Sequence, residues 1–93
     1  MKYALSYTHI FQKDYKRLEK RKYDLAKLDV VIKALQTGEA LDPKYKDHAL
    51  SGNWKGYREC HIQPDWLLVY KIQEEQLVLV LSRTGTHSDL KLA

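Results

Sequence analysis

The sequence predicts an α+β domain of two layers, in which a helical hairpin packs on one face of a four-stranded sheet. An early segment of loosely alternating residues suits a strand, the next two segments have the apolar spacing of helices, and three later segments have the composition of strands. The resulting order, β-α-α-β-β-β, is typical of a two-layer domain. Because 93 residues suffice for one hydrophobic core and not for two, we expect a single domain over residues 1–93.

The opening strand and the first helix are expected within the first 21 residues. Residues 2–7 alternate loosely and suit a short strand. In residues 8–21 the apolar positions recur at spacings of four and three, which is one helical face, and Thr8 suits the N-cap. This apolar face consists of Phe11, Tyr15 and Leu18. The opposite side carries Lys13, Lys16, Arg17 and Lys20, by default a solvated surface.

A second helix is expected between Asp24 as N-cap and Gly38 as terminator. Its apolar stripe comprises Leu25, Leu28, Val31, Ile32 and Leu35. Two amphipathic helices separated by a few residues form a helical hairpin, whose stripes must be buried against the rest of the domain.

Three strands should follow a long ordered loop at residues 39–53, where no periodicity is sustained. The strand candidates are residues 54–62, 66–72 and 76–83, joined by turns at 63–65 and 73–75. The last two are apolar on both faces at their centres, which places them inside the sheet.

Composition and charge narrow the class of protein. Sixteen Lys and Arg against twelve Asp and Glu give a net charge of +4, which favours a polyanionic or acidic partner but is weak evidence alone. Cys60 is the only cysteine, so no intrachain disulfide can form and a reducing compartment is expected. The first residues do not resemble a signal peptide, and the longest apolar runs have five residues. We therefore expect a cytoplasmic protein that does not enter the membrane.

Three of the four histidines are candidates for chemistry. His48 ends the long loop, His61 lies near the end of a strand, and His87 follows the last strand. Asp65 lies in the turn after His61, so these two must be close in space. Alternation along the strand places Glu59 and His61 on one face, and Arg58, Cys60 and Ile62 on the other. His9, near a helix start, is interpreted as incidental.

These residue types suit RNA cleavage through the RNA's own 2′-hydroxyl. That reaction needs a base, an acid and a cation beside the phosphate, and histidine serves the first two because its pKa of about 6.5 leaves both forms populated at neutral pH. Lys55, Arg58 and Arg83 are candidates for the cation. No metal or other cofactor is expected, because the substrate supplies the nucleophile.

Other interpretations of the same residues remain open. A histidine at a strand end is more often a surface or capping group than a catalyst. Histidines and a carboxylate can also hold zinc, although no H-x₃-H or C-x₂-C spacing is present. A nucleophilic role for Cys60 is disfavoured by its place on the side expected to face the core.

Several strings of residues, in register and with matching gaps, carry a resemblance to a known family. Residues 45–62, from Tyr45 to Ile62, resemble the signature stretch of YafQ-type mRNA interferase toxins of the RelE toxin–antitoxin superfamily, and residues 64–70 and 83–87 continue the match. The upstream helices fit in order and length, so the resemblance covers nearly the whole chain. One departure is the absence of the aromatic residue with which the family pattern usually ends, since Leu90-Lys91-Leu92-Ala93 stand there.

The resemblance implies a microbial ribonuclease-like fold and ribosome-dependent cleavage of mRNA. The family's catalytic positions fall on His48, His61, Asp65 and His87, with Glu59 as an acidic neighbour and Arg83 as a basic position. The implied partners are a cognate antitoxin and mRNA on the ribosome, with operator DNA bound only through the antitoxin. Our hypothesis is an endoribonuclease in which His87 is the acid, His48 or Asp65 the base, and His61 holds the phosphate. The alternative is a non-catalytic module that binds RNA or protein through the same basic face.

Overall fold

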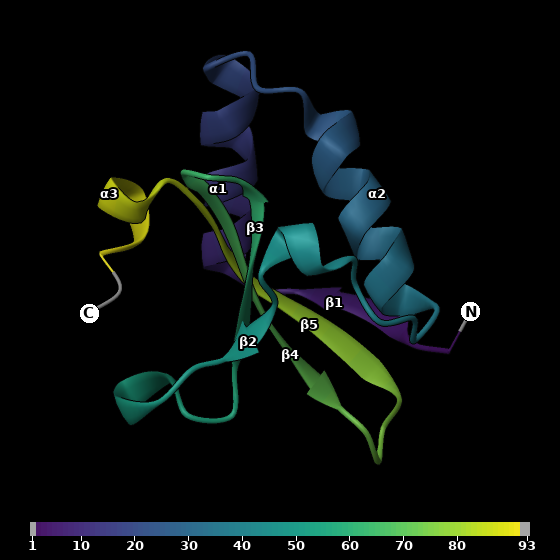
Figure 1. Cartoon of the computed structure of the whole chain (residues 1–93). Helices are drawn as coiled ribbons and strands as arrows, with labels where there is room; N and C mark the ends of the chain where they lie inside the picture. Colours follow the sequence, from purple (N-terminus) through teal and green to yellow (C-terminus); the bar gives the residue numbers. More distant parts are fainter. Residues whose placement is uncertain (1, 92–93) are drawn as a thin grey trace.

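Two helices and a mixed sheet make up most of the structure, a computed structural model that describes residues 2–91 (Figure 1). In chain order the elements are β1 (Ala4–Tyr7), α1 (His9–Lys20), α2 (Leu25–Gln36), η1 (Pro43–Tyr45), β2 (His48–Ala49), η2 (Gly52–Trp54), β3 (Arg58–Gln63), β4 (Trp66–Gln73), β5 (Val78–Gly85) and α3 (His87–Leu90), where η denotes a turn of 3₁₀ helix. Within residues 2–91, no helix has both the length and the apolar character that crossing a bilayer requires.

The sheet has five strands in the order β1-β5-β4-β3-β2, one more than the four predicted. β1 runs parallel to β5, and the other neighbours are antiparallel. The additional strand, β2, has only two residues, which pair with Arg58 and Glu59. A segment so short shows no period in the sequence, and for that reason the prediction treated it as loop. The predicted interior position of β4 and β5 is confirmed.

Both helices begin where the sequence indicates. The Thr8 side chain accepts a hydrogen bond from the backbone N–H of Phe11, and Asp24 accepts one from Ala26. Such N-caps satisfy amide groups that have no partner inside the helix. After α2, Gly38 has φ +83°, a left-handed conformation that ends the helix at low steric cost.

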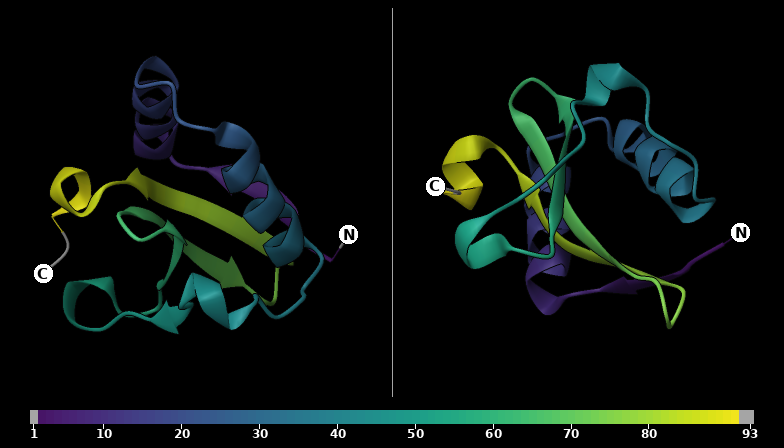
Figure 2. Two further views of the ribbon diagram at one scale, coloured as in Figure 1. Left: turned by 45° about the horizontal axis from the view of Figure 1, so that its top comes forward. Right: turned by 60° about the horizontal axis from the view of Figure 1, so that its bottom comes forward.

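One face of the sheet, the helix face, is covered by α1 and α2 (Figure 2). Their buried side chains pack against alternate residues of β3, β4 and β5 in one apolar core. The helices contribute Phe11, Leu18, Leu28, Val31, Ile32 and Leu35, and the strands contribute Cys60, Ile62, Trp66, Leu68, Tyr70, Leu79 and Leu81. The predicted helical hairpin on one face of the sheet is confirmed.

The opposite face, the open face, has a smaller apolar floor. Leu67 and Val69 of β4 are buried there with Leu90 of α3. Trp54 and Tyr57 pack at the edge of this floor, with ring centroids 5.2 Å apart. Leu90 belongs to the C-terminal segment that departs from the family pattern, and Leu92 and Ala93 lie outside the described residues.

The first residues of β3 and β5 differ from the prediction for local reasons. β3 begins at Arg58 rather than at residue 54, because residues 52–54 form η2 and Gly56 has φ +94°. β5 begins at Val78 rather than at residue 76, since Leu77 has φ +54° in the preceding turn, and it continues to Gly85. Neither left-handed residue is compatible with an extended strand.

Candidate active site

Three histidines from separate elements come together at the edge of the open face. His48 belongs to β2, His61 to β3, and His87 is the first residue of α3. The ring centroids of His48 and His61 are 6.4 Å apart, and those of His61 and His87 are 5.7 Å apart. We call these three residues the histidine cluster. Their convergence, which spacing alone could not establish, agrees with the sequence hypothesis.

The register of the sheet explains how His48 joins the cluster. His48 pairs directly with Glu59 of β3, and His61 follows Glu59 by two residues, so all three side chains lie on one face. The Glu59 Oε1 atom lies 3.6 Å from His48 Nε2 and 3.5 Å from His61 Nε2. Glu59 is 8% exposed, so its carboxylate is held between two imidazoles at the floor of the cluster.

In every ring of the cluster the Nδ1 atom faces an oxygen acceptor. His48 Nδ1 lies 2.7 Å from the Lys46 carbonyl, and His61 Nδ1 lies 3.4 Å from the Pro64 carbonyl. His87 Nδ1 lies 2.5 Å from Asp65 Oδ1. A neutral imidazole carries one proton, so donation from Nδ1 leaves Nε2 as the unprotonated, reactive nitrogen. Of the three Nε2 atoms, those of His48 and His61 face the Glu59 carboxylate at 3.6 and 3.5 Å, and that of His87 has no ion-pair partner among residues 2–91.

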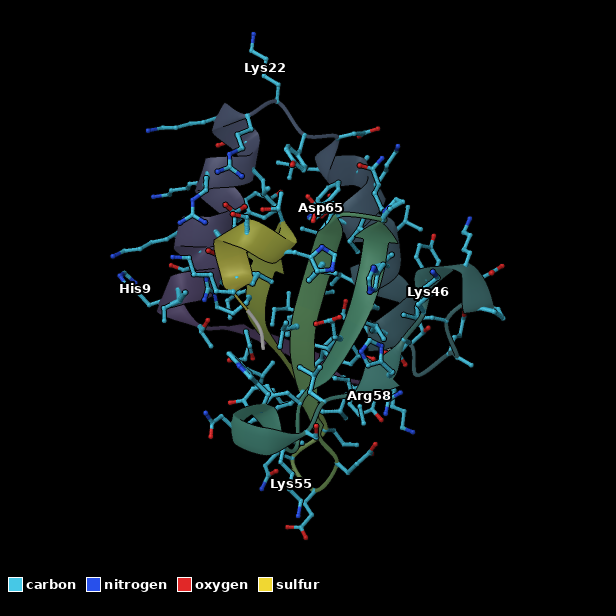
Figure 3. All side chains as sticks on the ribbon, turned by 60° about the vertical axis from the view of Figure 1, so that its left-hand side comes forward. His9, Lys22, Lys46, Lys55, Arg58 and Asp65 are labelled. Carbon is cyan, nitrogen blue, oxygen red and sulfur yellow. The ribbon has the colours of Figure 1, made fainter. Side chains whose placement is uncertain are left out.

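Asp65 binds His87 through two contacts from the tip of the β3–β4 hairpin (Figure 3). Its Oδ1 atom accepts a hydrogen bond from the backbone N–H of His87 at 2.9 Å as well as from the ring. The backbone hydrogen bond, followed by the ring contact, lowers the pKa of the Asp65 carboxyl. Asp65 is thus an ionised group that orients the His87 ring, although the sequence placed it only near His61.

The short helix α3, which the prediction lacked, fixes the position of His87. Thr86 and Asp89 form a capping box, in which each side chain accepts a hydrogen bond from the other's backbone N–H. Arg21 at the end of α1 binds the Asp89 carboxylate with distances of 2.7 and 3.1 Å. This guanidinium lowers the pKa of Asp89 to about 2. The Thr86-x-x-Asp89 spacing was a sequence signal for this helix.

Of the three candidate cations, Arg83 alone belongs to the open face. Glu59 pairs with Val69, and Val69 pairs with Arg83, so these side chains form one row across the sheet. Arg83 donates from Nε and Nη2 to Asp14 of α1, at 2.8 and 3.2 Å. Asp14 is 1% exposed and also accepts the backbone N–H of Thr84. Asp14, a buried carboxylate on a helix that carries several lysines and arginines, was not among the candidates from the sequence.

Arg58 and Lys55 do not reach the histidine cluster. Arg58 lies on the helix face, as the alternation predicted, and binds Asp47 with a shortest distance of 3.0 Å. The hydroxyl of Tyr70 donates to the other Asp47 oxygen, and burial is the main cause that raises the pKa of this phenol. Lys55 is exposed after η2, at the end of the sheet opposite Asp65 (Figure 3). Their substrate-binding role stays a prediction.

The remaining reactive residue types lie outside the cluster. Burial raises the pKa of the Cys60 thiol to about 12, so it carries no thiolate at neutral pH. His9 lies on α1, away from Asp65 (Figure 3). Among residues 2–91, no group of three or more His, Cys, Asp or Glu side chains has the geometry to hold a metal ion.

Comparisons with known proteins identify the family and the fold of this chain. Residues 3–92 match the family model of YafQ, a bacterial toxin of type II toxin–antitoxin systems. The mRNA interferase toxin YafQ of Escherichia coli (strain K12) is 41% identical over 87 residues, covering 92% of each chain. A metal-bound toxin from Helicobacter pylori superposes with a TM-score of 0.89 and 45% identity, covering 95% of this chain and 98% of the other.

The same fold occurs in a complex of two proteins. The structure of the E. coli DinJ–YafQ toxin–antitoxin complex contains a chain that superposes with a TM-score of 0.87 and 40% identity, covering 97% of this chain and 98% of that one. Family model, sequence identity and fold agree over nearly the full length of the chain. The protein therefore belongs to the YafQ family of toxins of bacterial type II toxin–antitoxin systems.

Proposed function

We propose that this protein is an endoribonuclease toxin that cuts mRNA on the ribosome through the RNA's own 2′-hydroxyl, without a metal ion in the chemical step. The observation that carries the proposal is the histidine cluster, in which each Nδ1 faces an oxygen acceptor, so that proton transfer falls to Nε2. The names of the curated relatives, mRNA interferase toxin, support the choice of RNA as substrate.

His87 is the general acid in this proposal. It reacts as the imidazolium, whose Nε2 proton passes to the 5′-oxygen as the bond from phosphorus to that oxygen breaks, which leaves a free 5′-hydroxyl. Asp65 holds the ring by Nδ1 and balances the charge of its protonated form. Because Asp65 is already occupied by two His87 contacts, it positions the acid and does not serve as the base.

His48 is the general base. With Nδ1 donating to the Lys46 carbonyl, its Nε2 accepts the proton of the 2′-hydroxyl. The 2′-oxygen then attacks phosphorus, forming a 2′,3′-cyclic phosphate on one product. The two transfers leave the net charge of the protein unchanged but move one proton from His87 to His48. Proton exchange with water then restores the starting state for the next cycle.

His61 lies between the acid and the base and contacts the phosphate in this scheme. Glu59 lies beside both Nε2 atoms, so its carboxylate balances the charge of the His48 ring once that ring has taken the 2′-hydroxyl proton. Arg83 contacts the phosphate in this scheme through Nη1, since Nε and Nη2 bind Asp14, whose carboxylate balances part of the guanidinium charge. Lys55 and Arg58 have no part in the proposed step.

The proposed cellular setting is the cytoplasm, where the protein meets translating ribosomes and a cognate antitoxin. The DinJ–YafQ complexes support the antitoxin. We expect the antitoxin to cover or distort the face that bears His61 and His87, and operator DNA to be bound only through it. A complex that leaves this face open and unchanged would contradict inhibition by occlusion.

The decisive test compares His87→Ala with His9→Ala, a histidine exposed outside the cluster. Cleavage of mRNA on translating ribosomes should fall at least roughly 10²-fold in His87→Ala and stay unchanged in His9→Ala. Both variants should keep their free energy of unfolding within about 1 kcal/mol of wild type. A His87→Ala protein that still cuts would place the acid elsewhere, and a wild type that binds RNA without cutting it would favour the non-catalytic alternative.

Metal content is tested on the purified protein, because ribosomes themselves need magnesium. We expect less than one equivalent of zinc or copper and no loss of activity after chelation and removal of the chelator. One tightly bound metal per chain, with activity lost on its removal, would contradict the metal-free scheme.

A further inference from the structure

A groove of about 510 Å³ lies next to the histidine cluster, and His61 is one of the residues that line it. Lys27 of α2 and Lys44 and Lys46 around η1 line it, together with the end of β3. We call it the lysine groove. The lysine groove takes no part in the chemical step proposed above. It adjoins the histidine cluster because the His61 side chain belongs to both.

The sheet leaves room for this groove because β2 is short. β2 pairs only with Arg58 and Glu59, so within the described chain no strand covers this edge of β3 from Cys60 to Gln63. The segment that precedes β2, the turn η1, lies there instead, beside β3 and α2 (Figure 1). Lys46 accordingly lies on the side of β3 away from α3 (Figure 3).

The charge of the lysine groove is not neutralised by the protein. None of the residues that line it is acidic. Among the ion pairs of residues 2–91, none involves Lys27, Lys44 or Lys46. All three are exposed at its rim. Uncompensated positive charge around a concave surface attracts polyanions more strongly than the same charge on a convex one.

The floor of the groove is apolar. Ile62 and Pro64 of the β3 end contribute to it, and Val30 of α2 stands opposite, 61% exposed. Grooves that bind single-stranded nucleic acid combine positive charge for the backbone with apolar or aromatic surface for bases and sugars. We propose that the lysine groove binds the single-stranded RNA segment adjoining the bond that is cut, with Lys27 and Lys44 contacting successive phosphates.

The position of His61 supports an RNA strand as the occupant. His61 lines the groove and belongs to the histidine cluster, so a strand whose phosphate lies at His61 continues directly into the groove. The basic surface of α1 is less suited to an RNA strand, because Lys16 shares its hollow with the carboxylate of Asp29 and Arg17 is already paired with Asp14. This inference rests on the proposed ribonuclease function.

The test uses a fluorescently labelled 12-nucleotide single-stranded RNA and a His87→Ala background, in which the proposed chemistry is blocked. Lys27→Gln with Lys44→Gln removes two charges from the groove, and Lys13→Gln with Lys20→Gln removes two from exposed positions of α1. The groove variant should bind roughly 10- to 100-fold more weakly at about 50 mM salt, with a slope of log K against log salt reduced by about 1.4. The α1 variant should keep its slope and bind within about threefold.

Several results would overturn the inference while leaving the proposed reaction intact. These are equal weakening by both pairs of substitutions, the absence of any RNA binding by the parent protein at low salt, and a groove variant that loses antitoxin binding but keeps RNA binding. Conversely, a loss of RNA affinity limited to the groove variant would uphold the groove even if wild-type protein proved unable to cut RNA. Thermal melting of each variant confirms that the fold is retained.

Discussion

The two faces of the sheet differ in how closely their carboxylates are bound by neighbouring side chains. On the helix face, the Asp47 carboxylate is saturated by the Tyr70 hydroxyl and two Arg58 nitrogens at 2.5 to 3.3 Å. On the open face, the Glu59 carboxylate makes only longer contacts of 3.5 and 3.6 Å with His61 and His48. Arg58 and Glu59 are neighbours in sequence, yet alternation along β3 assigns one to each face.

We infer from this difference that the polar groups of the helix face stabilise the fold, whereas those of the open face are available for a substrate. The short hydrogen bonds of the half-buried Asp47 stabilise the fold, because a hydrogen bond to a charged group contributes more than one between neutral groups. Groups with free nitrogen atoms and long contacts contribute little to stability but remain available for a substrate. The Arg83–Asp14 pair connects the two faces. Arg83 belongs to the open-face row of β5, and its guanidinium donates to the buried carboxylate of Asp14 on α1.

The largest effect on stability is expected from Asp14→Ala. The substitution leaves the Arg83 guanidinium and the Thr84 N–H without their buried acceptor, which should lower the free energy of unfolding by about 3 kcal/mol. Chemical denaturation measures this value. Glu19→Ala, an exposed carboxylate on the same helix, should change it by under about 0.5 kcal/mol. An equal change in the free energy of unfolding in both variants would mean that the Asp14 contacts do not stabilise the fold.

A smaller loss is expected from Tyr70→Phe. Removing the buried hydroxyl deletes a hydrogen bond to the charged Asp47, a loss of about 1.5 to 2 kcal/mol in the free energy of unfolding. Tyr57→Phe on the open face is the matched control and should stay within about 0.5 kcal/mol. Since Asp47 directly precedes His48, faster proteolysis of the loop at residues 39–53 should accompany the loss; an unchanged Tyr70→Phe protein would refute the assigned role.

The Arg21–Asp89 pair predicts a modest acid dependence of stability. The folded-state pKa of Asp89, about 2, lies below its ordinary value of about 3.9, so the stabilisation is present above about pH 4 and is lost as the pH falls towards 2. Arg21 is 42% exposed, so screening by water should keep the contribution under about 1 kcal/mol. Arg21→Gln should flatten this part of the pH profile, whereas Lys20→Gln should not. An identical profile in both variants would exclude the pair as its cause.

The smallest effect on stability is expected from His48→Ala, since this side chain is 50% exposed on the open face. The free energy of unfolding should change by about 0.5 kcal/mol or less. Under the proposed mechanism the same variant loses at least roughly 10²-fold in cleavage rate. A large loss of stability would show that the open face also supports the fold, and would weaken the comparison between the two faces.

The local elements of this fold follow from the sequence. The spacing of Phe11 and Leu18 predicts the buried side of α1, and Thr8 and Asp24 mark both helix starts. The alternation along β3 places Cys60 and Ile62 in the core and His61 on the other face. These features depend on residues that are only a few positions apart in the chain. The helical and strand periods of the sequence therefore predict them.

The site and its supports are decided by tertiary structure. His87 meets Asp65 across 22 residues, and Arg83 meets Asp14 across 69, with only the pairing of β3, β4 and β5 and the packing of α1 to bring them together. The two-residue β2 exists because β3 offers it an edge, and it carries His48 to Glu59. Backbone pairing between distant segments has no period along the chain. The sequence therefore determined which groups could do chemistry, and the sheet decided which of them meet.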